Sequence, residues 1–253
     1  MNHEANHPVR TSEKTITLIR ELRKRGGAQI HELEDGVEMT KGAIHNHLST
    51  LREQGLATKE EDVYRLSLAF LTLGGYVRSN YEIYIYGRPK ADQLANNTGM
   101  LVNLMTEENG EGVYLYQSRG ENAVNLYTHV GYRVTLHSSA LGKAILAELP
   151  RERVAEIVEQ RGLPAMTENT ITEVDALYEE LDRIAEQGYA TEHEEMTEGL
   201  ACIAAPIQVD NELLGAISIS APTRRLGKKG FMDEIVSEVQ STANETSLDI
   251  KYK

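Results

Sequence analysis

Two histidines stand one residue apart in the stretch AIHNHLSTL, at His45 and His47. Such a pair could bind a metal ion if both rings faced the same side. However, Ile44, Leu48 and Leu51 recur at helical spacing, and residues two apart on a helix point about 200° from each other. The two histidines therefore cannot share a metal ion. We expect His47 to lie beside the buried stripe and His45 to face outward.

The outward face of this helix carries side chains suited to contact with DNA. Asn46 points most directly away from the apolar stripe, and an asparagine can pair through two hydrogen bonds with adenine in the major groove. An ordinary solvated helix face is the alternative interpretation. The predicted DNA-contacting residues are Thr40, Lys41, Gly42, His45, Asn46, Ser49 and Arg52.

A second group of reactive side chains lies in the C-terminal half. Cys202 is the only cysteine, which excludes an internal disulfide, and it or Ser139 could act as a nucleophile. Neither is accompanied by a base with a positioned partner, and His137 is only a neighbour of Ser139 in sequence. The acidic residues around His193 match no specific metal-ligand spacing. We therefore expect no catalytic residue, no metal and no cofactor, with an enzyme as the alternative.

The elements that must position these residues begin with a compact N-terminal domain, residues 1–67. A helix ends near Gly26-Gly27, a short one follows from about Gln29, and a third begins after Thr40, a residue that can cap it. The stretch LATKEEDVYRLS then predicts two short strands joined by an acidic turn. Three helices and a hairpin are typical of a winged helix-turn-helix, and a generic small helical bundle is the alternative.

The remainder predicts a linker and an α+β domain. Residues 68–98 predict a linker helix, followed by the first helix of the next domain, and their leucine and tyrosine content suggests burial against a second chain. Residues 99–253 alternate strand-like and helical runs, with strands expected at 100–106, 112–118 and 123–129 and again after residue 188. Asp210-Asn211 marks a hairpin turn. This order favours an antiparallel sheet covered by helices.

The charge distribution limits where a polyanion could bind. The net charge is −13, of which −1 belongs to residues 1–67 and −12 to residues 68–253. DNA affinity must therefore come from a local patch and from several copies acting together. With no Trp and two Phe, the acidic excess also suggests a salty cytoplasm, as in a halophilic archaeon. No apolar run approaches the roughly 20 residues of a membrane helix, so we expect a cytoplasmic protein without a membrane partner.

Four motifs in order carry a resemblance to a known family. They are HSSALGKAILAEL, TENTIT, GYATEHEEMTEGLACIAAPI and AISISAPTRR. The chain resembles, over nearly its full length, the isocitrate-lyase-regulator (IclR) family of transcription factors. The resemblance implies a winged helix-turn-helix, a dimerising linker helix and a GAF-like effector-binding domain. It also implies a homodimer or a dimer of dimers on partly palindromic double-stranded operators, with small organic acids, aromatic acids or sugar-derived metabolites as effectors.

The same resemblance implies an effector site. Its residues are Val124, Leu126, Val134, Ala140, Leu141, Glu192, Cys202, Ser218 and Ser220. The family usually has Arg where Asn46 stands and a shorter acid where Glu192 stands, so neither operator preference nor effector preference can be transferred. We expect a regulator of a catabolic operon that binds a sugar, sugar acid or other organic acid. A ligand-binding scaffold without DNA binding is a further alternative.

Overall fold

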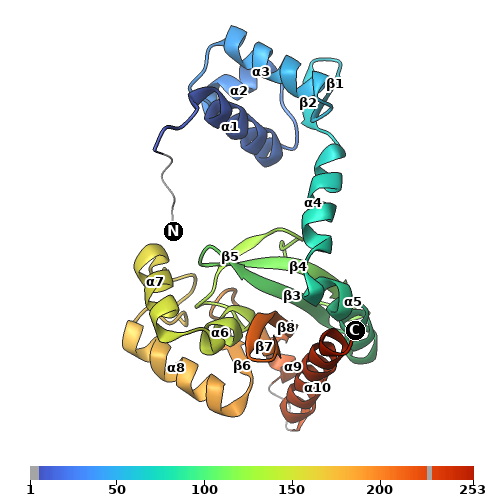
Figure 1. Cartoon of the computed structure of the whole chain (residues 1–253), viewed down its shortest axis with the longest axis vertical. Helices are drawn as coiled ribbons and strands as arrows, with labels where there is room; N and C mark the ends of the chain where they lie inside the picture. The colour runs from blue at the N-terminus through green and yellow to red at the C-terminus, as the bar shows by residue number, and fades with distance from the viewer. Residues whose placement is uncertain (1–5, 227–229) are drawn as a thin grey trace. The chain divides into compact units, whose positions relative to one another are not determined.

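The computed structural model describes residues 6–226 and 230–253 of the chain. It divides into two compact units, one ending at Asn80 and the other beginning at Tyr81. The first unit (Figure 1) contains α1 (Arg10–Arg25), α2 (Ile30–Leu33), the 3-10 helix η1 (Glu34–Gly36), α3 (Lys41–Glu53), β1 (Ala57–Glu60), β2 (Val63–Leu66) and α4 (Ala69–Ser79). The second contains α5 (Glu82–Thr98), β3 (Leu101–Glu108), β4 (Glu111–Arg119), β5 (Arg133–Thr135), α6 (Ala140–Glu148), α7 (Arg151–Arg161), α8 (Val174–Gln187), β6 (Ala190–His193), β7 (Leu200–Val209), β8 (Glu212–Pro222), α9 (Thr223–Leu226) and α10 (Phe231–Lys251).

The first unit forms the predicted winged helix-turn-helix. Helices α1, α2 and α3 enclose a small core that includes Leu18, Leu33 and Leu48, each 0% exposed. Strands β1 and β2 pair antiparallel, and Tyr64 on β2 also bridges to Ala28 before α2. The hairpin is thereby joined to the helices as a wing. The expected linker segment forms α4, whose residues are all at least partly exposed, followed by α5 at the start of the second unit.

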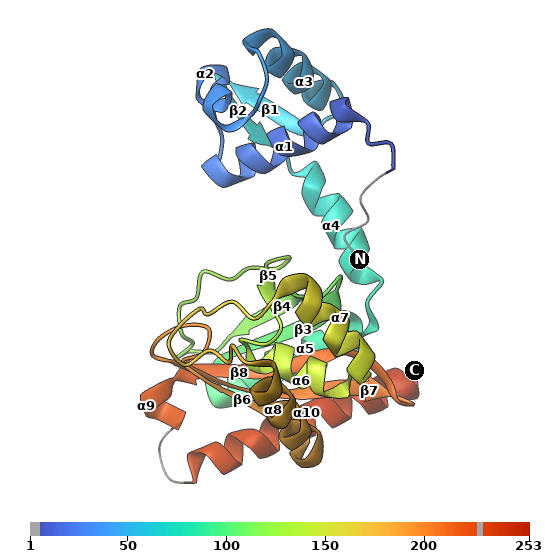
Figure 2. The same ribbon diagram turned by 90° about the vertical axis from the view of Figure 1, so that its left-hand side faces the viewer.

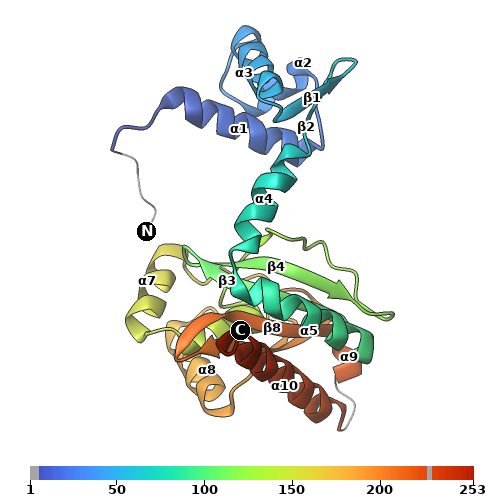
Figure 3. The ribbon, with the colours of Figure 1, turned by 45° about the vertical axis from the view of Figure 1, so that its right-hand side comes forward.

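The second unit is built on a six-stranded antiparallel sheet of order β5-β4-β3-β8-β7-β6. Helices α6, α7 and α8 pack with one face of this sheet, and α5 and α10 pack against the other (Figures 1 and 2). Helices α5 and α10 lie side by side (Figure 3). This is the expected α+β arrangement. None of the helices in the described part of the chain is long and apolar enough to cross a membrane.

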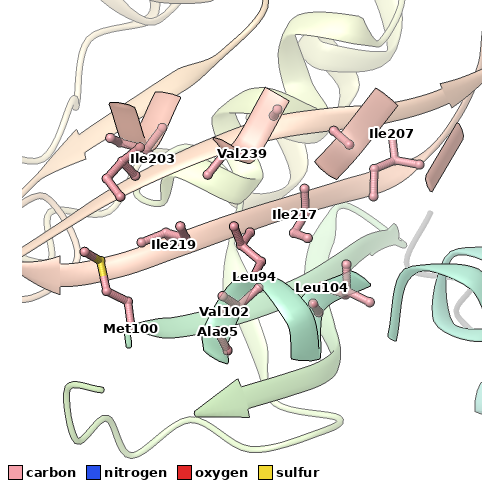
Figure 4. Close-up of a cluster of buried hydrophobic side chains, with 14 of the residues drawn as sticks. Leu94, Ala95, Met100, Val102, Leu104, Ile203, Ile207, Ile217, Ile219 and Val239 are labelled. Carbon is pink, nitrogen blue, oxygen red and sulfur yellow. The ribbon is translucent and has the colours of Figure 1, made fainter. Parts of the chain in front are cut away.

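The two sheet faces differ because side chains alternate along each strand. Val102 and Leu104 on β3 and Ile217 and Ile219 on β8 point towards α5 and α10 and form a continuous apolar cluster with Val239 (Figure 4). On the opposite face, the alternate positions of β8 are Ala216, Ser218 and Ser220, and Asn103 stands between Leu101 and Met105 on β3. The face that carries α6 therefore combines an apolar core with a group of buried polar side chains.

One predicted strand is wrong. Residues 123–129 form no strand, and the sheet edge next to β4 is the short β5 instead. The segment is held to β4 through side chains rather than a backbone ladder, since Arg119 contacts Asn125, and Gln117 contacts Thr128. The predicted hairpin turn is confirmed, because Asp210 and Asn211 both have positive φ (51° and 66°), as a type I′ turn between β7 and β8 requires.

Candidate nucleic-acid interface and ligand pocket

Helix α3 begins and packs as its sequence predicts. The Thr40 hydroxyl accepts a hydrogen bond from the Ala43 N–H at 3.3 Å and caps the first turn. Ile44, Leu48 and Leu51 are buried in the core of the first unit. This stripe fixes the rotation of the helix about its axis, so the polar positions between the apolar ones lie on the outer side.

The outer side of α3 contains the predicted DNA-contacting residues. Of that set, Ser49 is half-buried, and the rest are exposed: Thr40, Lys41, Gly42, His45, Asn46 and Arg52. A Cβ added to Gly42 would meet nothing within 4 Å, so the helix start is open to close approach. Lys41 lies 3.3 Å from Glu34, but an exposed ion pair of this kind is worth at most about 1 kcal/mol and does not prevent a phosphate contact.

His47 has a structural contact that separates it from His45. Its Nδ1 lies 2.8 Å from the Thr15 hydroxyl on α1, and that hydroxyl donates to the Thr11 carbonyl at 2.9 Å. Because the single hydroxyl proton is already used, Nδ1 must donate to Thr15. His47 therefore connects α3 to α1, whereas His45 is exposed on the outer side.

The wing contributes little free positive charge. Lys59 lies 3.1 Å from Asp62, and Arg65 lies 3.4 Å from Glu60, so both wing cations are paired with wing carboxylates. Glu61 at the turn adds a further negative charge. The wing thus carries three carboxylates against two cations, whereas the exposed residues of α3 include two cations, Lys41 and Arg52, and one carboxylate, Glu53.

In the second unit, a cavity lies between the polar face of the sheet and the start of α6. Seven of the nine predicted effector-site residues line it, from five separate stretches of chain: Leu126, Ala140, Leu141, Glu192, Cys202, Ser218 and Ser220. The side chains leave about 10 Å³ of free volume, roughly the space of a single water. A metabolite can therefore enter only if lining side chains move.

The other two predicted residues do not line the cavity. Val134 pairs with Gly112 at the sheet edge and packs on the α6–α8 core, while the Val124 carbonyl accepts from Arg119. The β5 strand and the irregular segment before it turn these side chains elsewhere. The lining also includes four residues that were not predicted: Tyr114, Ser139, Met196 and Leu200. Of these, Ser139 lies in the motif HSSALGKAILAEL, and Met196 and Leu200 lie in the motif GYATEHEEMTEGLACIAAPI, but none of the four was assigned to the site.

Glu192 is the buried acid of the cavity. It is 1% exposed, and its Oε1 accepts hydrogen bonds from the backbone N–H groups of Glu195 (2.7 Å) and Met196 (3.1 Å). Burial raises its pKa, and the two backbone donors oppose that rise only in part. The carboxyl thus combines acceptor oxygens with an increased tendency to hold a proton.

A buried lysine holds the adjacent segment in place. Lys143 on α6 is 1% exposed, and its Nζ lies 2.6 Å from Glu195 Oε1 and 3.2 Å from Glu180 Oε1. The pairing ties α6, α8 and the connection after β6 together. Since that connection also supplies the N–H donors to Glu192, Lys143 indirectly positions the cavity acid.

Neither candidate nucleophile has the surroundings of a catalytic group. Burial raises the pKa of the Cys202 thiol well above its usual value, which disfavours the reactive thiolate. The Ser139 hydroxyl accepts from the Gly142 N–H at 3.1 Å and caps α6. His137 donates from Nε2 to the Pro164 carbonyl at 3.2 Å. The site is therefore arranged to bind rather than to transfer groups.

The cavity also contains the hydroxyl groups of Tyr114, Ser218 and Ser220, and backbone donors at the start of α6. Ala140 and Leu141 occupy the first two positions of α6, where N–H groups have no partner within the helix. Such groups can donate to a ligand oxygen. Across residues 6–226 and 230–253, no three His, Cys, Asp or Glu side chains come together as a metal site requires.

A helix-turn-helix unit and a second unit with a buried polar cavity define a transcriptional regulator of the ligand-responsive class. The family model for the bacterial transcriptional regulator IclR C-terminal domain matches residues 76–248, and the bacterial regulatory protein arsR family model matches residues 13–59. The chain belongs to the IclR family of transcriptional regulators, as the motifs had indicated. Its function is therefore DNA-binding regulation rather than catalysis.

Individual relatives agree with this assignment. A probable HTH-type transcriptional regulator, ArcR, from Halobacterium salinarum is 34% identical over 234 residues, covering 90% of this chain and 89% of that protein. The crystal structure of Thermotoga maritima IclR has a TM-score of 0.83 at 26% identity and covers 96% of this chain and 99% of that one. An IclR homolog from Microbacterium hydrocarbonoxydans, complexed with 4-hydroxybenzoate, shares the fold at a TM-score of 0.80 and 17% identity, covering 93% of this chain and 98% of that one.

Proposed function

We propose that this protein regulates a catabolic operon in the cytoplasm, with α3 reading the operator and the cavity binding a sugar, sugar acid or other organic acid. The observation that carries this proposal is the cavity itself. Side chains from distant parts of the sequence meet around one buried space, and they combine apolar walls with a few hydrogen-bonding groups. That composition is typical of small-metabolite sites.

The operator contact is proposed for the outer side of α3. Asn46 and Arg52 are exposed there and belong to residues 1–67, which carry almost none of the acidic excess. Asn46 would read a base edge, while Lys41 and Arg52 would contact phosphates.

A homodimer, and a dimer of dimers, is proposed from the surface of α4. Five large apolar side chains on or next to this helix are 53–79% exposed: Leu68, Leu71, Leu73, Tyr76 and Val77. An apolar surface of this kind is expected to be covered by another chain. Two helix-turn-helix units would then face the two halves of a partly palindromic operator.

In this proposal the metabolite acts by selecting one arrangement of the dimer. A ligand shifts an equilibrium only if it binds one state more tightly than the other. Because the cavity now has room for only about one water, the ligand-bound state must differ in the placement of lining residues. That difference would alter the spacing of the recognition helices and hence operator affinity.

The test combines footprinting with a metabolite screen. The purified protein should protect a site upstream of its own gene or of adjacent catabolic genes at moderate salt, and a compound that raises its melting temperature should change that protection. Protection of no site in these regions would contradict the proposal. A stabilising compound without any effect on DNA would instead favour the ligand-binding scaffold.

A further inference from the structure

The polar groups of the cavity continue along the sheet beyond its lining. Strand register places Glu192 opposite Cys202, and Cys202 opposite Ser220. On the next strands, Ser218 lies opposite Asn103, and Asn103 opposite Gln117. All of these positions are on the face that carries α6, so they form one polar row across β6, β7, β8, β3 and β4.

Side-chain hydrogen bonds join the row from Cys202 to Gln117. The Cys202 thiol and the Ser220 hydroxyl are 3.2 Å apart, and Asn103 Nδ2 donates to Ser220 at 3.5 Å. Gln117 Nε2 donates to Asn103 Oδ1 at 3.0 Å and to the Thr128 hydroxyl at 2.6 Å. Asn103 is 2% exposed. A buried amide must satisfy both its donors and its acceptor, and the 3.5 Å contact is long for such a bond.

We propose that Asn103 and Gln117 are specificity-determining residues of the ligand site, and that the ligand is an extended polyhydroxylated compound, a sugar or sugar acid. This inference rests on the proposed function of the cavity. Hydroxyl groups both donate and accept, so a chain of them can replace the hydrogen bonds of the row one for one. A ligand with one polar end would contact only one part of the row.

The dimensions and charges of the row favour this class. Neighbouring strands are about 4.8 Å apart, and Asn103 lies two residues along β3 from Leu101, the residue in register with Ser220, so the backbone positions of Glu192 and Asn103 are separated by about 16 Å. No Lys or Arg is among the described residues that line the cavity, so an anionic group has only the backbone donors at the start of α6. Hydroxyl groups, by contrast, find partners along the whole row.

Movement of the segment that contains Leu126 and Thr128 would provide space for such a ligand. Leu126 lines the cavity, and Thr128, two residues later, accepts from Gln117. Residues 124–128 form no helix or strand, and no backbone–backbone hydrogen bond holds them within the described part of the chain, although both flanks of the segment are bonded to the sheet domain. A ligand hydroxyl that replaces Thr128 on Gln117 would displace Leu126 at the same time and enlarge the cavity.

The test measures binding of D-gluconate, D-glucose and D-glycerate by calorimetry to the full-length protein and to an Asn103→Ala variant. The wild type should bind gluconate or glucose more tightly than glycerate. Asn103→Ala should weaken binding of the longer probe about tenfold and leave glycerate unaffected. Comparing gluconate with glucose shows whether a carboxylate contributes.

Two further variants keep the test decisive. Gln117→Leu should reproduce the selective loss if Asn103→Ala fails to fold. Thr246→Val is the matched control, because Thr246 is equally buried but lies on α10 at the other face of the sheet. The inference would be overturned if the wild type bound neither gluconate nor glucose, or if it bound glycerate equally tightly. It would also be overturned if the variants lost the same amount of affinity for glycerate as for the longer probe. Footprinting of the wild type tests the proposed function separately, so the two failures are distinguishable.

Discussion

Replacing Asn46 with alanine should weaken specific operator binding without affecting the fold. The side chain is exposed and makes no hydrogen bond within the described part of the chain; besides the bonds of the helix itself, the backbone carbonyl of Asn46 accepts from the Thr50 hydroxyl at 3.1 Å. Alanine also favours helix slightly more than asparagine, so the free energy of unfolding should change by no more than about 0.5 kcal/mol. A bidentate contact with adenine is worth about 1–3 kcal/mol, equivalent to about 5- to 150-fold in affinity.

The assay is fluorescence anisotropy with a labelled operator and a scrambled duplex of the same length, each at several salt concentrations. Asn46→Ala should lower the ratio of specific to non-specific affinity, because phosphate contacts are retained. His47→Ala is the matched control, since it removes the contact with Thr15 and should cost about 1 kcal/mol of stability while leaving the ratio unchanged. An unchanged ratio for Asn46→Ala, or an equal change for both variants, would refute the assignment of this face.

Three further predictions concern the cavity and α4. Burial raises the pKa of Glu192, so the stability provided by its neutral form is full at low pH and is lost as the pH rises through the folded-state pKa. Glu192→Gln should therefore stabilise the protein more at about pH 8 than at about pH 5, as measured by urea denaturation. An equal effect at both pH values would contradict this prediction. Lys143→Met leaves buried carboxylates without a cation and should destabilise the protein by about 3–5 kcal/mol, partly recovered by adding Glu195→Gln. Leu71→Glu should dissociate the proposed dimer in sedimentation experiments, whereas the same change at exposed Met166, which is not part of α4, should not.

Sequence reasoning succeeded where structure depends on near neighbours. The spacing of Ile44, Leu48 and Leu51 set the rotation of α3, and the hydrogen bond between His47 and Thr15 agrees with the inward position predicted for His47. Helix caps and turns at Thr40 and Asp210-Asn211 were also predictable, because their geometry is decided within a few residues.

Sequence reasoning was wrong where an alternating pattern predicted a strand but the pairing depended on another segment of the chain. Residues 123–129 alternate as a strand would, but β4 pairs with Arg133–Thr135 instead. Local sequence patterns do not show which of two neighbouring segments pairs with β4 at the edge of the sheet. Val124 and Val134 do not line the cavity for the same reason, whereas Met196 enters it from the irregular connection after β6 and Leu200 from the first position of β7.

The sequence by itself determined the family, the winged helix-turn-helix and most of the cavity residues, because these follow from motifs and from local periodicity. Only the tertiary structure decided that Asn103 and Gln117 join the polar row of Glu192, Cys202 and Ser220. These residues lie on five different strands, and the order and register of those strands arise from packing of the whole sheet. A one-residue shift in register would turn Asn103 towards α5 and α10 and break the row.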